Sequence, residues 1–494
     1  MAKTRVLFIV FCLLSVLSAT AQNGFINYDV ANGFASAAPQ YLTAHNGRLY
    51  FFANNGSSGR EFMYIEDTNK AVLPQNLAAG NKNAIGNGYK RPIAGMGSKV
   101  YFTSTNGSAG EEVFMYDGTT VKLIADLTFG PDSSRPDYYT PLNGKLYFIA
   151  TTAAGGTELY EYNEVNFPKM VTDINPGAAN SVSGPVIAFD NKIFFVATTS
   201  AYGSELWFYD PVADTSGLAA DIDTGVASSN PADFTVINGK LYLSASTVKN
   251  GREMYEYDGS NAPTMLTDIS PSGLSSISPS YSNAFAWYNN KIYFAGRDTF
   301  GQTHVHSYNP ANSDVKLEFK INTNGSSQPR DFVVYNKQLF FTANDGSKGF
   351  ELYHYDSTGT MASLVGDLCD GANGSFPMEL TPVGDNLFFA GNDCNLGIEV
   401  IAFNYKKVGI QDIALPQEIS VYPNPVQDEL HINFTLQQKQ QVPVTLTDVY
   451  GRTVYSTTKE YSAGAQRIAI PMSGLATGVY IYNVGGSAGK VVKE

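Results

Sequence analysis

The sequence contains few of the residues that usually carry catalysis or bind metal ions. Its 494 residues include three cysteines, five histidines and two tryptophans. The histidines form no recognisable Ser/His/Asp or Cys/His arrangement, and the HExxH and phosphate-loop motifs are missing. A glycosidase-type carboxylate pair stays open, because aspartate and glutamate together number 45. The sequence thus identifies no catalytic residue and favours a protein that is not an enzyme.

Basic residues are also scarce. Lysine and arginine together number 32, which gives a formal net charge of −13. Binding to a phosphate backbone needs clustered lysine and arginine, so this balance argues against a nucleic-acid partner. An acidic surface favours cations or basic partners instead.

Long hydrophobic runs are missing except at the N-terminus. Residues 1–21 combine the basic Lys3 and Arg5, an apolar run that ends at Leu17, and the small-residue ending Ala19-Thr20-Ala21. This pattern is typical of a secretory signal peptide. The run is too short to span a bilayer as a helix, so we expect export and no membrane span.

Cysteine is rare in the mature chain, where only Cys369 and Cys394 follow the signal peptide. Exported proteins meet oxidising conditions, which favours one disulfide between these residues. Two unpaired thiols are the alternative. Both residues fall in predicted loops of neighbouring repeat units, within disulfide reach.

The sequence is rich in a repeated pattern that occurs eight times. Hydrophobic triplets recur 46 to 51 residues apart, centred on Tyr50, Tyr101, Tyr147, Phe194, Tyr242, Tyr293, Phe340 and Phe388. Eleven residues after each centre stand Glu61, Glu112, Glu158, Glu205, Glu253, His304, Glu351 and Glu399. A period of this length, built of short strands and turns, is typical of a β-propeller.

The fifth unit shows four predicted strands, at residues 234–237, 240–245, 253–257 and 264–269. The turn Asn238-Gly239 permits the positive φ angles of a two-residue hairpin. The eighth unit ends after its third strand, and we expect residues 25–30 to supply the fourth and so close the ring. The prediction is an all-β, eight-bladed propeller over residues 22–406, with seven blades as the alternative.

The motif around the repeated acid is Gly-x-Glu-hydrophobic-aromatic, as in Gly203-Ser204-Glu205-Leu206-Trp207. Together with Tyr116-Asp117-Gly118-Thr119, it resembles the ELWxxDGT repeats of secreted bacterial proteins, over roughly residues 25–406. The resemblance implies a fold and no particular chemistry.

A second acid ends the predicted fourth strand in most units. It is found at Asp29, Asp126, Asp173, Asp221, Asp268 and Asp367, with Asn76 and Lys320 in the matching places of the first and sixth units. We expect the repeated acids to accept backbone N–H bonds from turns, as structural caps. Calcium binding by loop oxygens is the alternative, although no DxDxDG loop is present, and no other cofactor is expected.

The sixth unit departs from both acidic positions, with His304 and Lys320 in place of the carboxylates and His306 two residues further on. Loss of the acid-centred hydrogen bonds by sequence drift is one interpretation. The other is a local site for a transition metal or an anion, because imidazole and ammonium groups serve either.

The pattern changes after residue 406. A linker is predicted over residues 407–418, followed by a small immunoglobulin-like β-sandwich over residues 419–494. Its motifs are centred on Tyr422, Pro423, Asn424, Pro425, Gly451, Gly478 and Tyr480. They resemble the type A C-terminal sorting domain of the Bacteroidetes type IX secretion system. The resemblance implies recognition by that secretion machinery, removal of the domain, and either release or attachment to lipopolysaccharide.

These features together predict a protein exported across both membranes to the cell surface or the extracellular space. We expect a binding or adhesion module for glycans or surface proteins, with contact through long inter-unit loops such as residues 270–283 and 322–330. Trp207 and Trp287 lie in strand patterns and are expected to pack inside. The alternatives are a polysaccharide-degrading enzyme that uses carboxylates on the propeller face, and a structural surface-layer component.

Overall fold

The computed structural model describes residues 24–31, 35–66, 70–270, 273–277, 283–359, 361–405, 417–436, 440–448, 452–485 and 487–494. The predicted signal peptide and nearly all of the predicted linker lie outside these residues. The chain divides into two compact units, residues 1–404 and 405–494, which we describe separately. The described residues form strands and turns and no α-helix, so the fold is all-β.

The first unit is a β-propeller whose described residues form eight antiparallel four-stranded sheets. Sheets one to four are β2 (Gln40–His45), β3 (Arg48–Asn54), β4 (Arg60–Ile65), β5 (Ala71–Val72); β6 (Ile93–Met96), β7 (Lys99–Ser104), β8 (Glu112–Tyr116), β9 (Val121–Ala125); β10 (Asp137–Leu142), β11 (Lys145–Thr152), β12 (Gly156–Tyr162), β13 (Lys169–Met170); and β14 (Val182–Phe189), β15 (Lys192–Thr199), β16 (Gly203–Asp210), β17 (Thr215–Ala220).

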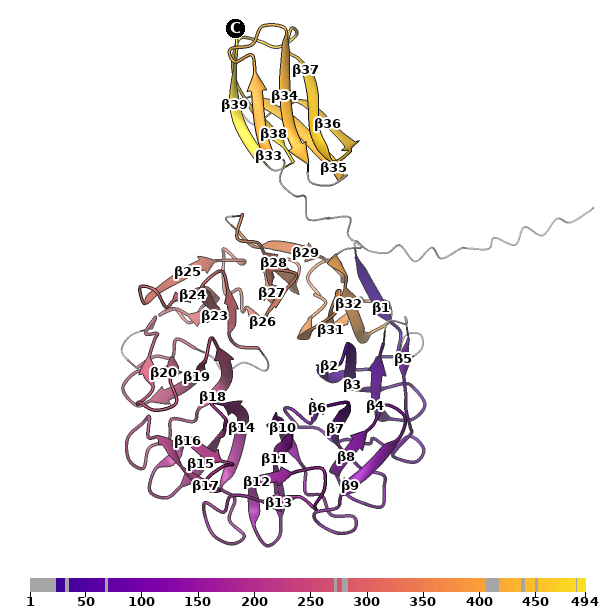
Figure 1. The fold of residues 1–494 in the computed structure, drawn as a ribbon, viewed down its shortest axis with the longest axis vertical. Helices are drawn as coiled ribbons and strands as arrows, with labels where there is room; N and C mark the ends of the chain where they lie inside the picture. Colours follow the sequence, from indigo (N-terminus) through magenta and orange to yellow (C-terminus); the bar gives the residue numbers. More distant parts are fainter. Residues whose placement is uncertain are drawn as a thin grey trace, which may run out of the picture. The chain divides into compact units, whose positions relative to one another are not determined.

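Sheets five to eight are β18 (Ala232–Ile237), β19 (Lys240–Thr247), β20 (Gly251–Tyr257), β21 (Thr264–Met265); β22 (Ala286–Tyr288), β23 (Lys291–Arg297), β24 (Thr303–Asn309), β25 (Asp314–Phe319); β26 (Arg330–Tyr335), β27 (Gln338–Asn344), β28 (Phe350–Tyr355), β29 (Ser363–Gly366); and β30 (Met378–Val383), β31 (Asn386–Asn392), β32 (Ile398–Phe403), β1 (Phe25–Tyr28). The sheets stand in a ring with the first strand of each innermost (Figure 1).

The N-terminal strand closes the ring, as the sequence predicts. Strand β1 pairs antiparallel with β32, with Phe25 opposite Phe403 and Tyr28 opposite Val400. The eighth sheet therefore joins residues from both ends of the unit, and its outer edge strand comes from the N-terminus.

The predicted fourth strand of sheet five is too long. Residues 264–269 were expected to be extended, but β21 pairs with β20 only over Thr264–Met265. The Thr267 hydroxyl accepts the Met254 N–H at 2.9 Å and donates to Glu253 at 2.6 Å. A side chain thus replaces the backbone ladder at this point, which ends the strand early.

The core lies between neighbouring sheets, because alternate side chains of the second and third strands project from both sheet faces. At the boundary of sheets one and two, Phe62 stacks on Phe102 with ring centroids 3.9 Å apart and planes 2° apart. Tight turns hold the hairpins, and Asn238 and Gly239 take φ angles of 49° and 74° as the Asn-Gly pair predicts.

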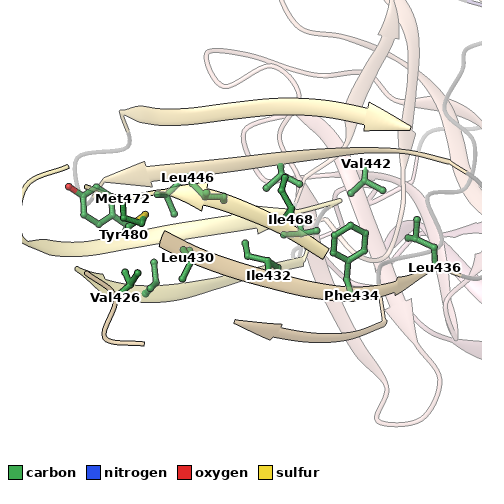
Figure 2. Packing of buried hydrophobic residues seen from close by; sticks show 14 residues of the cluster. Val426, Leu430, Ile432, Phe434, Leu436, Val442, Leu446, Ile468, Met472 and Tyr480 are labelled. Carbon is green, nitrogen blue, oxygen red and sulfur yellow. The ribbon is translucent and has the colours of Figure 1, made fainter. Parts of the chain in front are cut away.

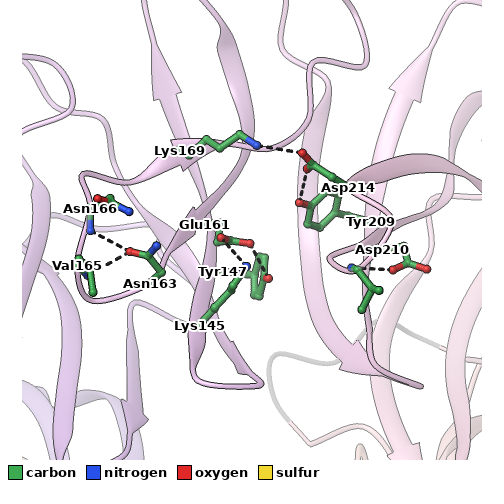
Figure 3. A network of polar contacts seen from close by, with 11 residues as sticks. Lys145, Tyr147, Glu161, Asn163, Val165, Asn166, Lys169, Tyr209, Asp210 and Asp214 are labelled. Carbon is green, nitrogen blue, oxygen red and sulfur yellow. Dashed lines mark hydrogen bonds and ion pairs between the residues drawn. The ribbon is translucent and has the colours of Figure 1, made fainter.

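The ring has two faces, which we name by their loops. The connections between sheets and the turns between second and third strands form the connection face, and the other turns form the turn face. On the turn face, carboxylates tie lysine and tyrosine side chains together (Figure 3). Glu161 pairs with Lys145 at 2.9 Å and accepts the Tyr147 hydroxyl, while Asp214 of sheet four pairs with Lys169 of sheet three at 3.2 Å.

The second unit is a β-sandwich. One sheet contains β33 (Gln417–Tyr422), β34 (Glu429–Leu436) and β37 (Gly464–Pro471), and the other contains β36 (Thr453–Tyr461), β35 (Gln440–Asp448), β38 (Gly478–Val484) and β39 (Ser487–Lys493). Leu430, Ile432, Phe434, Leu446 and Ile468 fill the space between the sheets (Figure 2). Across the described parts of both units, no helix is long and apolar enough to cross a membrane.

Candidate functional site

The repeated glutamates are buried inside the ring. Glu61, Glu112, Glu158, Glu205, Glu253, Glu351 and Glu399 are each at most 1% exposed. Glu112 on β8 accepts the backbone N–H groups of Leu127 at 3.0 Å and Ser134 at 2.8 Å. Glu205 makes the same two bonds to Ile222 and Ser229. Each carboxylate therefore fixes the connection that leaves its own sheet.

The connections held by these glutamates also bond to the next sheet. The Ser134 carbonyl, beside Glu112, accepts the N–H of Thr151 at the end of β11 in the following sheet, at 2.8 Å. Buried serines take this place in six sheets: Ser134, Ser181, Ser229, Ser276, Ser327 and Ser375. These serines were not predicted. The recurring Ser-x-Pro in four connections, as in Ser134-Arg135-Pro136, was the pattern that marked them.

Burial perturbs the acid-base chemistry of the repeated glutamates. It raises the pKa of Glu61, Glu253, Glu351 and Glu399 to about 7, against the effect of their N–H donors, and it also raises the pKa of Glu158 and Glu205. Removing a carboxylate from water disfavours its charged form, which is the cause of the shift.

The second set of acids lies nearer the surface. Asp126 and Asp221 accept the N–H groups of Gly130 and Gly225 at 3.1 and 3.0 Å, and Asp367 pairs with Lys348 at 2.9 Å. The other members, Asp29, Asp173 and Asp268, are exposed. Within the described residues, no group of three or more His, Cys, Asp or Glu side chains is placed to hold a metal ion.

The histidines of the sixth sheet are buried. His304 takes the place of the glutamate on β24, and its Nδ1 lies 2.9 Å from the Ser327 hydroxyl, so it contacts the same serine position as the carboxylates do. His306 packs on Phe294 and its Nδ1 lies 3.1 Å from the His304 carbonyl. Lys320 is exposed. The three side chains thus form no common surface patch.

The two cysteines of the mature chain form a disulfide, with Cα atoms 5.2 Å apart. Cys369 is buried in the connection after sheet seven, and Cys394 is exposed in the turn between β31 and β32. The bond therefore joins two neighbouring sheets on the connection face.

Removing this bond is expected to destabilise the propeller moderately. Exchange of Cys394 for serine should lower the free energy of unfolding by about 2 kcal/mol, because the bond closes a loop of modest length in the unfolded chain. Denaturant unfolding with and without reductant tests this. A reductant effect of the same size in the Cys394→Ser variant would contradict it.

The sorting motif lies at one end of the sandwich. The Tyr422 ring contacts His431 with centroids 5.5 Å apart, and the Asn424 side-chain oxygen accepts the Val492 N–H at 2.9 Å. Tyr480 donates its hydroxyl to the Ala476 carbonyl at 2.9 Å. Pro423 and Pro425 flank Asn424, Gly478 begins β38, and Gly451 lies outside the described residues.

One pocket in the propeller was not predicted. It has a volume of about 380 Å³ and lies at the connection-face ends of the innermost strands of sheets one, seven and eight. Apolar side chains and a few polar groups line it: Ala38, Pro39, Gln40, Tyr41, Asn87, Tyr89, Lys90, Arg330, Asp331, Met378, Glu379, Ala390 and Ile398. We call it the central pocket.

Strained backbone places several of these side chains. The innermost strand carries a register shift in six sheets, and the residue there has a positive φ: Tyr41 62°, Tyr138 57°, Gly184 70°, Asp233 60°, Asp331 61° and Glu379 58°. Non-glycine residues pay about 1 kcal/mol or more for this conformation. Bulges of this kind re-aim side chains, and three of the six line the central pocket.

The acids of the central pocket also hold neighbouring sheets. Glu379 of sheet eight accepts the Leu42 N–H of sheet one at 2.7 Å, and Asp331 of sheet seven accepts the Leu380 N–H of sheet eight at 3.0 Å. Burial raises the pKa of Glu379 to about 7, with a further rise from nearby Asp331.

One polar group of the pocket has no partner. Within the described part of the chain, Gln40 Oε1 is buried without a hydrogen-bond partner, whereas the Tyr41 hydroxyl interacts with the Tyr89 backbone N–H. At the position that matches Gln40 in sheet three, Asp137 accepts the N–H groups of Lys90 and Arg91. Among the described residues, sheet one therefore leaves one buried acceptor free inside a mainly apolar pocket.

A sequence pattern marks the pocket in retrospect. Proline, any residue, then Tyr, Asp or Glu begins the innermost strand in five sheets, as in Pro39-Gln40-Tyr41 and Pro377-Met378-Glu379. This third repeated position lies outside the pattern of the second and third strands and was not predicted.

Comparisons with known proteins give a family match for the second unit alone. Residues 420–494 match the family described as the secretion system C-terminal sorting domain. No curated protein matches the chain in sequence. Similar solved structures include PorZ, an essential bacterial surface component of the type IX secretion system of Porphyromonas gingivalis, at 14% identity over 94% of this chain and 70% of that one, with a TM-score of 0.40.

Two further similar structures are propellers. The WD40 domain of SCAP from fission yeast is 11% identical, covering 78% of this chain and 95% of that one, with a TM-score of 0.45. The propeller domain of the Trilobed protease from Pyrococcus furiosus is 10% identical, covering 64% and 95%, with a TM-score of 0.38. None of these likenesses bears on function. The C-terminal unit is a type IX secretion sorting domain, which implies export of the protein to the cell surface or the extracellular space.

Proposed function

We propose that the protein is a surface or secreted binding module that holds a glycan in the central pocket. The observation that carries the proposal is the pocket itself, which is mainly apolar and contains one buried acceptor, Gln40 Oε1, without a partner among the described residues. Such pockets orient small ligands through a small number of polar contacts. The Tyr41 ring offers a surface for a sugar, and the Gln40 amide offers hydrogen bonds.

The ring is well suited to hold such a site. Seven buried glutamates and one histidine join the sheets, so the strained strands that line the pocket rest on a rigid scaffold. The repeats resemble the ELWxxDGT type of secreted proteins, and the sorting domain delivers the module outside the cell. Export by the sorting domain supports surface glycans as ligands, because these are available outside the cell, and a surface protein as ligand is the other outcome.

The test is retention of the purified exported protein on a panel of immobilised polysaccharides. Exchange of Tyr41 for alanine should weaken retention at least about tenfold, the scale of one lost buried aromatic contact. Tyr202→Ala is the matched control, because Tyr202 is 39% exposed on the same face, in the turn between β15 and β16, and lies outside the pocket. Equal loss in both variants would place the contact on the outer loops instead.

A second candidate is a polysaccharide-degrading enzyme. It is favoured by the neighbouring carboxyl groups of Asp331 and Glu379, since a pKa of about 7 at Glu379 suits a general acid. Release of soluble sugars during the retention assay, lost in the Glu379→Gln variant, would support this function.

A further inference from the structure

One side of the central pocket carries cations that bond to neutral groups. Arg60 donates to the side-chain oxygen of the pocket-lining Asn87 at 2.7 Å, and Arg135 donates to the Asn87 carbonyl at 3.1 Å. Among the residues that the structure describes, the pocket-lining Lys90 has no carboxylate within ion-pair distance of its ammonium group, and neither do Arg60 and Arg135.

The lysines of the turn face behave differently. Eight of them pair with carboxylates at 2.5 to 3.9 Å: Lys99, Lys122, Lys145, Lys169, Lys192, Lys240, Lys291 and Lys316. The chain as a whole carries a net charge of −13, so carboxylates are not in short supply. Lys90, Arg60 and Arg135 beside the pocket therefore stay without ion pairs, among the described residues, although carboxylates are abundant.

The carboxylates nearest the pocket already accept hydrogen bonds from other groups. Glu111 accepts the Gly86 N–H and the Tyr89 hydroxyl. Asp137 accepts backbone N–H groups, and Glu379 accepts that of Leu42. Asp331 accepts the Leu380 N–H and the Asn283 amide. Hydrogen-bond donors offset part of the charge of these carboxylates.

Two guanidinium groups flank one residue of the pocket wall. Asn87 lines the pocket, with Arg60 on its side chain and Arg135 on its backbone, and Lys90 lies three residues further on. Arg135 also lies over the Tyr89 ring, with its guanidinium carbon 5.1 Å from the centroid. A guanidinium fork pairs well with a carboxylate or a sulfate group.

We infer that the ligand of the central pocket is an anionic glycan, whose sugar carboxylates or sulfate esters pair with Lys90, Arg60 and Arg135. The inference rests on the proposed function, that the pocket binds a glycan, and it specifies the chemical class of that glycan. The apolar wall with Tyr41 contacts the sugar ring, and the cations at the mouth contact its acidic substituent.

The first test compares probes of equal backbone and different charge. Binding of the exported protein to oligogalacturonate should be at least about tenfold tighter than to its methyl ester, and should weaken as salt is raised. Dextran sulfate against dextran is the second pair, and it shows whether sulfate serves in place of carboxylate. Equal affinity for charged and neutral members of both pairs would overturn the inference while leaving the glycan pocket standing.

The second test determines whether these cations bind the charged probe. The double variant Lys90→Gln, Arg135→Gln should lose at least about tenfold in affinity for the charged probe and most of its salt dependence. Lys145→Gln removes one paired lysine from the turn face and should change neither. An equal loss in both would point to the field of the whole protein and overturn the site. Failure of Tyr41→Ala to weaken any probe would instead remove the proposed function.

Discussion

The Glu351→Ala variant is expected to lose about 3 to 5 kcal/mol of unfolding free energy, because burial leaves several donors without partners. Glu351 is fully buried on β28 and accepts the N–H of Ser375 at 2.7 Å, its hydroxyl at 2.5 Å and the Leu368 N–H at 3.5 Å. The variant also leaves a cavity between β28 and the connection to sheet eight. Denaturant unfolding measures the loss.

The control is Glu66→Ala. Glu66 is 38% exposed and pairs with Arg48 at the surface, so its removal should cost at most about 1 kcal/mol. If the two variants unfold at the same denaturant concentration, the repeated glutamates do not hold the ring together. The nearby disulfide should be intact in both proteins, so that its loss does not enter the comparison.

The propeller is expected to lose about 3 kcal/mol of stability between pH 6.5 and 8. Burial raises the folded pKa of Glu61, Glu253, Glu351, Glu379 and Glu399 to about 7, above the usual glutamate value of the unfolded chain. The folded state therefore binds more protons, so the stability from these groups is full below the unfolded pKa and is lost as pH rises through 7. Each glutamate accounts for a loss of about 0.8 kcal/mol in this window, about 4 kcal/mol in all, and buried histidines offset about 1 kcal/mol of this loss.

Three histidines change the free energy of unfolding with pH in the opposite direction. Burial lowers the pKa of His304, His306 and His354, so their stability is lost as pH falls below the ordinary histidine value. Because unfolded histidine is half protonated at pH 6.5, the three histidines together offset at most about 1 kcal/mol of the glutamate loss between pH 6.5 and 8. Thermal or denaturant unfolding at pH 6.5 and 8 makes the measurement. Stability that rises over this window would show that the N–H donors keep these carboxylates charged.

A variant isolates one of the titrating groups. Glu351→Gln cannot titrate at that position, so its loss between pH 6.5 and 8 should be smaller than that of the natural protein by about 0.8 kcal/mol. The comparison uses the difference between two pH values within each protein, so the constant cost of the amide at this site cancels.

The sequence determined the elements of the propeller because they depend on local chemistry. Aromatic triplets and Asn-Gly turns specify strands and hairpins, and their recurrence specifies repeated sheets. The pairing of β1 with β32 followed from counting strands in the last unit. The extent of β21 did not follow, because the Thr267 side chain ends the ladder through a contact with the neighbouring strand.

The partners of the repeated glutamates depended on folding. The sequence predicted that a carboxylate would cap a turn, but the bond from Ser134 to Thr151 of the next sheet exists only once neighbouring sheets pack. The same holds for His304, whose contact with Ser327 became apparent only when both were placed at one sheet boundary.

The sequence by itself determined the repeat, the closing strand and the sorting domain, because periodicity and short motifs are properties of neighbouring residues. Only the tertiary structure decided the central pocket. Gln40, Lys90, Arg330 and Glu379 come from four different sheets or connections, and a closed ring brings them to one mouth. Which cations there lack carboxylate partners is likewise a matter of distance across the ring, and no spacing along the chain encodes it.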